Sequence, residues 1–550
     1  MNSKRWYPTA VTLAAALLGA AAPLQAQGNS DGPLVQTSDG PVRGFVSNGV
    51  YQFLGIPYAA PPVGARRWMP PQPHAAWTQP LNATAFAPTC AQITTLGVFA
   101  GPANNNEDCL FLNVFTPKLG QGEKRPVLVW IHGGGFVDGE STDYDGSKLA
   151  QQGPTVVVTI NYRLGLLGYF GHPALDAEGH PFGNYGLMDQ QAALRWVRRN
   201  IAAFGGDPNN VALGGQSAGS AAAYANMISP ASAGLFHRAI GESGPLLTVL
   251  SRATAETRGT NFAIAAGCGA GADAATAACL RALPAAQIMA LQGTASANGP
   301  YVTGQFVDGT LIAMPADVAF ATGQFNRMPV INGTVEDEGN FGIGITQYFS
   351  GVPLTAAQYV INVTNIYSGN AGPGGTPPAY PPGTVDAVLA HYPLSAYATP
   401  QLAYDAVTTH PSACRARHLN QLLAPWVPVY AYEFTDRNAP YYFPVMSGFI
   451  PLAAHTIDIQ FLFPLWHGGP LGIPHPLTRP EEHLSDQLVA AWTNFARTGN
   501  PNGVADHPWP RYVADLDNYL VQDVPQLSTF TGSEFSANHQ CDFWDSVLLY

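Results

Sequence analysis

Residues 215–219 (GQSAG) constrain this chain more than any other stretch of its sequence. An apolar run at 211–213 precedes them and predicts a buried strand, and small residues at 220–227 follow them and favour a helix. A serine between a strand and a helix sits on a sharp turn that lifts its hydroxyl off the sheet. An ordinary Gly/Ser turn is the alternative reading. The strand-turn-helix context favours a nucleophile, Ser217.

Long apolar runs predict the frame that holds this turn. Runs that are apolar on both faces are typical of parallel strands covered by helices. They occupy residues 126–131, 155–161, 329–333 and 427–434. Amphipathic helices are expected over 187–204 and 484–496, and an Ala-rich helical insertion over 252–300. The sequence therefore predicts the α/β class, with one domain over 27–550 that carries insertions.

Two longer motifs suggest a family. Residues 204–219 (FGGDPNNVALGGQSAG) and 107–117 (EDCLFLNVFTP) resemble the two signatures of the type-B carboxylesterase, or cholinesterase-like, family of α/β-hydrolases. Matching landmarks run from about residue 33 to the C-terminus. The resemblance implies an α/β-hydrolase fold with a large, mostly parallel central sheet, flanking helices and cap or gorge insertions. It also implies a serine carboxylic-ester hydrolase that works through an acyl-enzyme.

Ser217 needs a base, and in α/β-hydrolases the base is a histidine that follows both the serine and the acid along the chain. The segment that begins at His455 resembles the family's histidine segment. Thr456 stands where the family usually has Gly, and Asp458 where it usually has Glu. We expect His455 to be the base. His467 and His410 are the other candidates.

The acid should hold the second imidazole nitrogen and stabilise the imidazolium. The family places a Glu directly before a Gly after a late strand, and Glu338 in residues 334–339 (TVEDEG) matches that position. Glu336 and Asp337 are expected to be solvated loop charges.

The developing oxyanion needs backbone N–H donors. Ala218, the residue after the nucleophile, should supply one. Residues 132–135 (HGGG) follow a predicted central strand and match the lipase/esterase glycine loop. By the family resemblance Gly134 and Gly135 are the other donors, and Gly133 is a conformational requirement.

Six cysteines fit an oxidising compartment but allow fifteen pairings. The family resemblance implies the pairs Cys90–Cys109, Cys268–Cys279 and Cys414–Cys541. Residues 1–26 read as a secretory signal peptide, with a basic start, an apolar Ala/Leu-rich run and a small residue at Ala26. A secreted or periplasmic protein without a membrane span after cleavage is expected.

The composition limits the possible partners. A net charge of −12 without a basic run argues against nucleic acid. No metal or other cofactor is expected, because there is no C-x-x-C pair or Cys/His cluster and the acyl-transfer mechanism needs none. A small-molecule ester is the expected partner, and the sequence leaves the oligomeric state open.

The substrate is predicted only by class. Gln216 stands where many relatives carry Glu, and the loop between Cys90 and Cys109 has no Trp for cation–π contact with choline. Both features favour uncharged, partly hydrophobic esters. Five aromatic residues are candidates to line an apolar gorge, although residues of these types are more often ordinary core: Phe99, Phe136, Tyr301, Phe341 and Phe349. The alternatives are an amidase, a specialised detoxifying or polymer-degrading esterase and, with less support, a non-catalytic cholinesterase-like adhesion module.

Overall fold

The computed structural model describes residues 32–99, 101–244, 249–292, 295–296, 299–301, 304–368, 380–503 and 507–548. The predicted signal peptide, at 1–26, and most of a Pro/Gly-rich loop expected over 366–384 lie outside the described residues.

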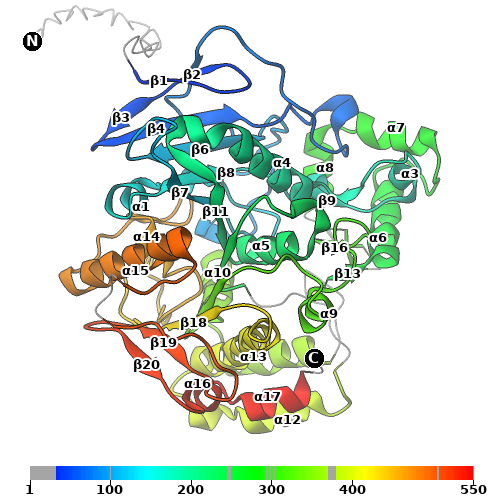
Figure 1. The fold of residues 1–550 in the computed structure, drawn as a ribbon. Coiled ribbons are helices and arrows are strands. Elements are labelled where there is room, and N and C mark those ends of the chain that lie inside the picture. Colours follow the sequence, from blue (N-terminus) through cyan, green and yellow to red (C-terminus); the bar gives the residue numbers. More distant parts are fainter. Residues whose placement is uncertain are drawn as a thin grey trace, which may run out of the picture.

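One large sheet runs through the molecule (Figure 1). Its eleven strands lie in the order β20-β19-β18-β17-β12-β11-β7-β8-β6-β4-β3. The central strands from β19 to β8 pair in parallel, and the strands at both edges are antiparallel. The bounds are β3 (Phe45–Ser47), β4 (Val50–Pro57), β6 (Phe111–Thr116), β7 (Arg125–Ile131), β8 (Val156–Ile160), β11 (Gly206–Gln216), β12 (Arg238–Glu242), β17 (Val330–Val335), β18 (Val429–Phe434), β19 (Tyr519–Gln522) and β20 (Ser528–Phe530).

Helices cover both faces of this sheet. The main ones are α1 (Ser147–Gln152), α4 (Tyr185–Asn200), α5 (Ala218–Ile228), α6 (Arg252–Ala265), α7 (Ala274–Ala282), α8 (Ala285–Gln292), α9 (Ala316–Ala321), α10 (Asn340–Ser350), α11 (Ala356–Tyr367), α12 (Thr384–His391), α13 (Pro400–Leu423), α15 (Arg479–Thr498) and α17 (Cys541–Val547). The chain alternates between the two faces within a strand. In β7, Val127 and Val129 pack with α4 and α5 in one core cluster, whereas Leu128 and Trp130 pack with α1 and α15 in another.

The structure confirms the α/β class and the predicted central strands. The expected helices correspond to α4, α5 and α15, and the Ala-rich segment forms α6, α7 and α8. The long helix α13 was not predicted, because Pro411 interrupts its sequence and its apolar residues follow no one-sided pattern.

The topology brings three loops to one edge of the sheet. The strands β7, β11, β12 and β17 are consecutive neighbours and run parallel, so their carboxyl ends meet at the same edge. The glycine loop follows β7, Ser217 follows β11 and Glu338 follows β17. Residues that are far apart in sequence are therefore delivered to one place.

The six cysteines form three disulfides, and their pairs are Cys90–Cys109, Cys268–Cys279 and Cys414–Cys541. The last one joins α13 to the C-terminal helix α17. Among the described residues no single helix is both long and apolar enough to cross a membrane, although α7 and α8 meet these criteria as a pair bent by 93°.

The disulfides differ in the length of chain they close, and this difference gives a test. Cys414 and Cys541 are 127 residues apart, and Cys268 and Cys279 are 11 apart. In the chain-entropy model, replacing the first pair by serine should lower the free energy of unfolding by about 5 kcal/mol, and replacing the second pair by about 3 kcal/mol. Urea unfolding of the two double variants measures both values. Equal losses, or a larger loss for the short loop, would contradict the expectation.

Candidate active site

Ser217 occupies a strained turn between β11 and α5. Its backbone has φ 58° and ψ −122°, a conformation that non-glycine residues rarely adopt. Its N–H donates to the carbonyl of Glu242 at 2.8 Å, which ties the turn to the neighbouring strand. The turn also needs Gly219, because a Cβ there would lie 2.0 Å from the carbonyl oxygen of Ile131.

His455 and Glu338 form a buried hydrogen-bonded pair. The imidazole Nδ1 contacts Oε2 of Glu338, and the side chains are 15% and 7% exposed. The other carboxylate oxygen, Oε1, accepts from the Thr334 hydroxyl at 2.6 Å and from the Val335 N–H at 3.1 Å. Burial alone would raise the pKa of Glu338, but the charge and hydrogen bond of His455 and the other two donors lower it below its usual value.

The imidazole lies at the serine turn. Its Nε2 is 3.1 Å from the side-chain nitrogen of Gln216, the residue directly before Ser217. Of the three candidate histidines, His455 is the one that meets Glu338. His410 lies on α13, with its Nδ1 2.9 Å from the Tyr392 hydroxyl, and burial lowers the pKa of His410 to about 3.

The departure at Thr456 has a structural cost. Its φ is 79°, in the left-handed region that glycine adopts freely and that is strained for a β-branched residue. The side chain is fully buried, and its hydroxyl lies 2.7 Å from the hydroxyl of Tyr442. This hydrogen bond holds the residue after His455 in a conformation that its side chain disfavours.

The glycine loop after β7 packs directly on the serine turn. A Cβ on Gly133 would lie 2.9 Å from the Gln216 carbonyl oxygen and 3.1 Å from the Cβ of Ser217. Gly134 and Gly135 both have positive φ, 106° and 60°. The Gly134 carbonyl accepts from two N–H groups later in its own loop, at 2.9 Å each, so the N–H of Gly135 in the same trans peptide points away from the loop interior.

Two side chains that the sequence analysis missed, one outside this loop and one within it, fix the loop to a neighbouring segment. Gln92 accepts from the N–H of Gly139 at 2.9 Å and donates to its carbonyl at 3.2 Å. Asp138 is fully buried and accepts from the N–H of Thr95 at 2.9 Å and from its hydroxyl. The partners are more than 40 residues apart in sequence, so no local pattern could have revealed these bonds. They attach the loop between Cys90 and Cys109 to the glycine loop.

The expectation that Asp337 is a solvated loop charge is wrong. The side chain is 2% exposed and makes two 2.8 Å hydrogen bonds with the Arg437 guanidinium. It also accepts from the N–H of Ala453 at 3.1 Å, two residues before His455. A buried carboxylate keeps its charge only with such partners. Asp337 therefore ties the turn that carries Glu338 to the segment that carries His455.

Two further carboxyl groups are buried near this pair. Burial and the charge of Glu338 raise the pKa of Asp458 to about 7, while the Tyr432 hydroxyl donates to it at 3.3 Å. Burial, followed by the charge of Asp458, raises the pKa of Glu242, which accepts from Trp492 Nε1 at 2.9 Å. The environment of both groups favours the uncharged form.

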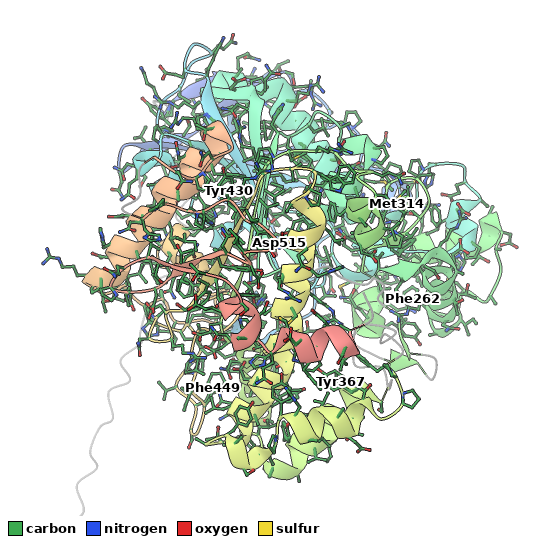
Figure 2. All side chains as sticks on the ribbon, turned by 60° about the horizontal axis from the view of Figure 1, so that its bottom comes forward. Phe262, Met314, Tyr367, Tyr430, Phe449 and Asp515 are labelled. Carbon is green, nitrogen blue, oxygen red and sulfur yellow. A yellow bond between two sulfur atoms is a disulfide. The ribbon has the colours of Figure 1, made fainter. Side chains whose placement is uncertain are left out.

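The predicted gorge residues separate into three groups. Phe341 lies 5.4 Å from the His455 ring, measured between ring centroids, and Phe99 packs behind it at 5.8 Å from Phe341. Phe136 instead packs against Tyr169, and Tyr301 against Phe262 (the latter residue is labelled in Figure 2). The fifth, Phe349, is exposed at the end of α10.

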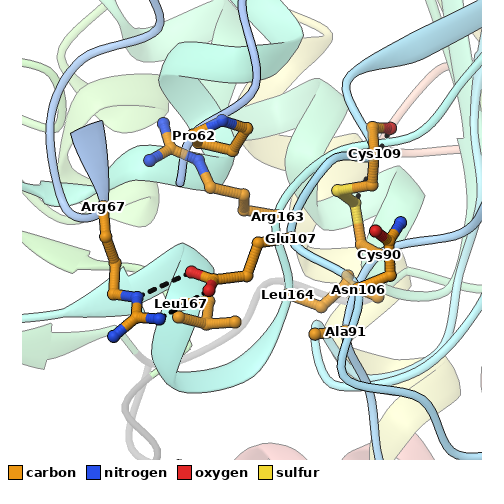
Figure 3. A pocket seen from close by; sticks show the side chains of 10 residues that line it. All are labelled: Pro62, Arg67, Cys90, Ala91, Asn106, Glu107, Cys109, Arg163, Leu164 and Leu167. Atoms are coloured by element: carbon orange, nitrogen blue, oxygen red, sulfur yellow. Dashed lines mark hydrogen bonds and ion pairs between the residues drawn. A yellow bond between two sulfur atoms is a disulfide. The ribbon is translucent and has the colours of Figure 1, made fainter. Parts of the chain in front are cut away.

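A pocket beside the Cys90–Cys109 disulfide is a separate feature (Figure 3). Its walls include Arg67, which forms an ion pair with Glu107. None of the three side chains predicted to form the triad lines it. In the described parts of the chain, no group of three or more His, Cys, Asp or Glu side chains is placed to hold a metal ion.

Comparison with known proteins identifies the family. The model of the carboxylesterase family matches residues 31–544. The chain belongs to the carboxylesterase family. Among its relatives are a medium-chain fatty acyl-CoA hydrolase precursor of Anas platyrhynchos (34% identity, 93% of this chain and 92% of the relative), an acylcarnitine hydrolase of Mus musculus (34%, 94% and 91%) and liver carboxylesterase 1 of Oryctolagus cuniculus (35%, 87% and 88%).

Membership makes this protein a carboxylic-ester hydrolase of the α/β-hydrolase fold, as the sequence motifs predicted. In this esterase the acid turn after β17, the histidine segment and the serine turn after β11 meet at the carboxyl edge of the sheet.

The buried Asp138 side chain should make the stability of the folded protein depend on pH. Burial raises its pKa from 3.8 to about 6, so its carboxyl favours the folded state below pH 3.8, and this contribution is lost as the pH rises through 6. Asn is neutral and has the same shape as Asp. At pH 8 the free energy of unfolding of Asp138→Asn should therefore exceed that of wild type by at most about 3 kcal/mol. The difference should shrink by pH 5. Urea unfolding at both pH values tests this, with exposed Asp515→Asn as control. A difference that is independent of pH would contradict it.

Proposed function

We propose that Ser217, Glu338 and His455 form a catalytic triad, with the N–H groups of Gly134, Gly135 and Ala218 as its oxyanion hole. The observation that carries the proposal is the chain of contacts from Glu338 to His455 Nδ1 and from His455 Nε2 to Gln216, beside Ser217. With Nδ1–H donating to Glu338, Nε2 is left as an acceptor that faces the serine turn.

In the proposed mechanism His455 takes the proton of Ser217 as the oxygen attacks an ester carbonyl. The three N–H groups bind the oxyanion, and His455 then protonates the leaving alcohol. Water hydrolyses the acyl-enzyme by the same route. Because the Gln216 amide lies at Nε2, the serine hydroxyl has to replace it as the donor when the proposed reaction begins.

Uncharged, partly hydrophobic esters are the proposed substrates. Gln216 places a neutral amide, rather than a carboxylate, at the imidazole, the ring of Phe341 lies beside it, and Phe99 packs on Phe341. The relatives named for fatty acyl-CoA and acylcarnitine hydrolysis support an apolar acyl group. We also propose that the chain is a single domain over 27–550 and that it is secreted or periplasmic after removal of residues 1–26. The three disulfides support an oxidising compartment.

The decisive experiment compares wild type with Ser217→Ala, Glu338→Gln and His455→Ala on dissolved p-nitrophenyl esters. Each variant should lower kcat by roughly 10⁴-fold or more at unchanged thermal stability. A panel that adds anilides and choline esters identifies the leaving group. An unchanged rate in Ser217→Ala would remove this serine from the mechanism, and a strong preference for choline esters would contradict the substrate class.

The side chain at position 216 should influence the pH at which kcat/KM falls on the acidic side of the pH–rate profile. In Gln216→Glu a carboxylate would replace the amide that lies 3.1 Å from His455 Nε2, and it would favour the protonated imidazole. The acidic limb of kcat/KM should therefore move upward by about one pH unit. The apolar variant Gln216→Met, which adds no charge, should leave the limb near its wild-type position. Equal shifts in both variants would show that charge is not the cause.

A further inference from the structure

Two segments beside the proposed active site are almost free of charge. Residues 339–368 contain no Asp, Glu, Lys or Arg, and residues 438–478 contain only Asp458, which is buried. The rest of the chain is acidic overall. Outside α11, seven exposed large apolar side chains lie on these segments and define the mouth face: Phe349, Val352, Val445, Ile450, Leu465, Leu471 and Ile473.

Contacts between the two segments make the mouth face one surface. The Gln347 side chain on α10 donates to the Ser447 carbonyl at 2.8 Å. On the same side, Cβ positions built at Gly344 and Gly448 would contact Phe449 and Pro353. Further along, the N–H of Ile473 donates to the carbonyl of Tyr442 at 2.9 Å. The end of α10 and the loops before and after His455 therefore form its framework.

A row of aromatic rings leads from this face to the imidazole. The exposed ring of Phe349 lies 5.4 Å from Tyr348, and Tyr348 lies 6.1 Å from Phe443. Phe443 lies 6.2 Å from Phe341, which lies 5.4 Å from His455, all measured between ring centroids. The row therefore joins the exposed ring of Phe349 to the ring that lies beside the proposed base.

We propose that the mouth face docks on the surface of a condensed, uncharged ester phase, such as a droplet of a water-insoluble ester, and draws single molecules from it into the site. The inference rests on the proposed function and specifies its substrate class. Docking would remove apolar surface from water, which is favourable. It would not bury a charge, and burying a charge is the main free-energy cost of such contacts. An acidic protein with a charge-free face suits an uncharged surface better than an anionic one.

The test compares dissolved p-nitrophenyl acetate with emulsified tributyrin. Val445 is fully exposed and Val352 is 62% exposed, so Val445→Asp and Val352→Asp should fold normally while placing a charge in the contact. We expect each to lower the rate on droplets by about tenfold and the rate on dissolved ester by less than about twofold. The matched control is Ile264→Asp, a residue on α6 that is 54% exposed. In Figure 2, Phe262 of α6 lies at the right of the view and Phe449, next to Ile450 of the mouth face, lies at the lower left.

A binding measurement separates docking from chemistry. Ser217→Ala should still float with tributyrin droplets, and Ser217→Ala combined with Val445→Asp should remain in the aqueous phase. Equal losses on both substrates, unchanged droplet rates, or flotation with phosphatidylcholine vesicles but not with tributyrin would each overturn the inference. Failure of the proposed function would look different, because wild type would then not hydrolyse the dissolved ester through Ser217.

Discussion

The hydrogen bond between Glu338 and His455 connects segments that lie 117 residues apart, and the geometry of the site depends on it. The structure supports it on both sides. Thr334 and Val335 hold the carboxylate, and Asp337 ties the turn that carries the acid to the backbone just before the imidazole. Glu338 is buried and the His455 side chain is 15% exposed, so the bond is largely shielded from water. The hydrogen bonds of Thr334, Val335 and Asp337 together hold this one contact in place.

Backbone strain surrounds the same contact. Ser217 and Thr456 both have positive φ, and each is fixed by a neighbour, Ser217 by the carbonyl of Glu242 and Thr456 by the hydroxyl of Tyr442. Such conformations persist only where the surroundings over-determine them. The glycine loop is fixed in a similar way, because Gln92 makes two hydrogen bonds with the backbone of Gly139. These contacts hold the proposed oxyanion donors in place, as the proposed electrostatic stabilisation requires.

The site and the segments around it also carry little charge. Gln216 places an amide at the imidazole, burial raises the pKa values of Asp458 and Glu242, and the segments around the mouth carry almost no exposed charge. An unpaired charge is costly where water is excluded, so this arrangement is in keeping with the proposed uncharged substrate. Nearly all acidic residues are placed elsewhere in the chain.

The sequence by itself determined the α/β class, the central strands, the serine turn and the family, because these depend on local periodicity and on short motifs around Ser217. It also singled out Glu338 and His455, through motif order. Tertiary structure alone decided that Asp337 is buried and paired with Arg437, that Gln92 fixes the glycine loop, and that two charge-free segments form one face. These features are contacts between residues tens to hundreds of positions apart. Local sequence patterns could not predict them, because such patterns do not indicate which distant segments will meet in the fold.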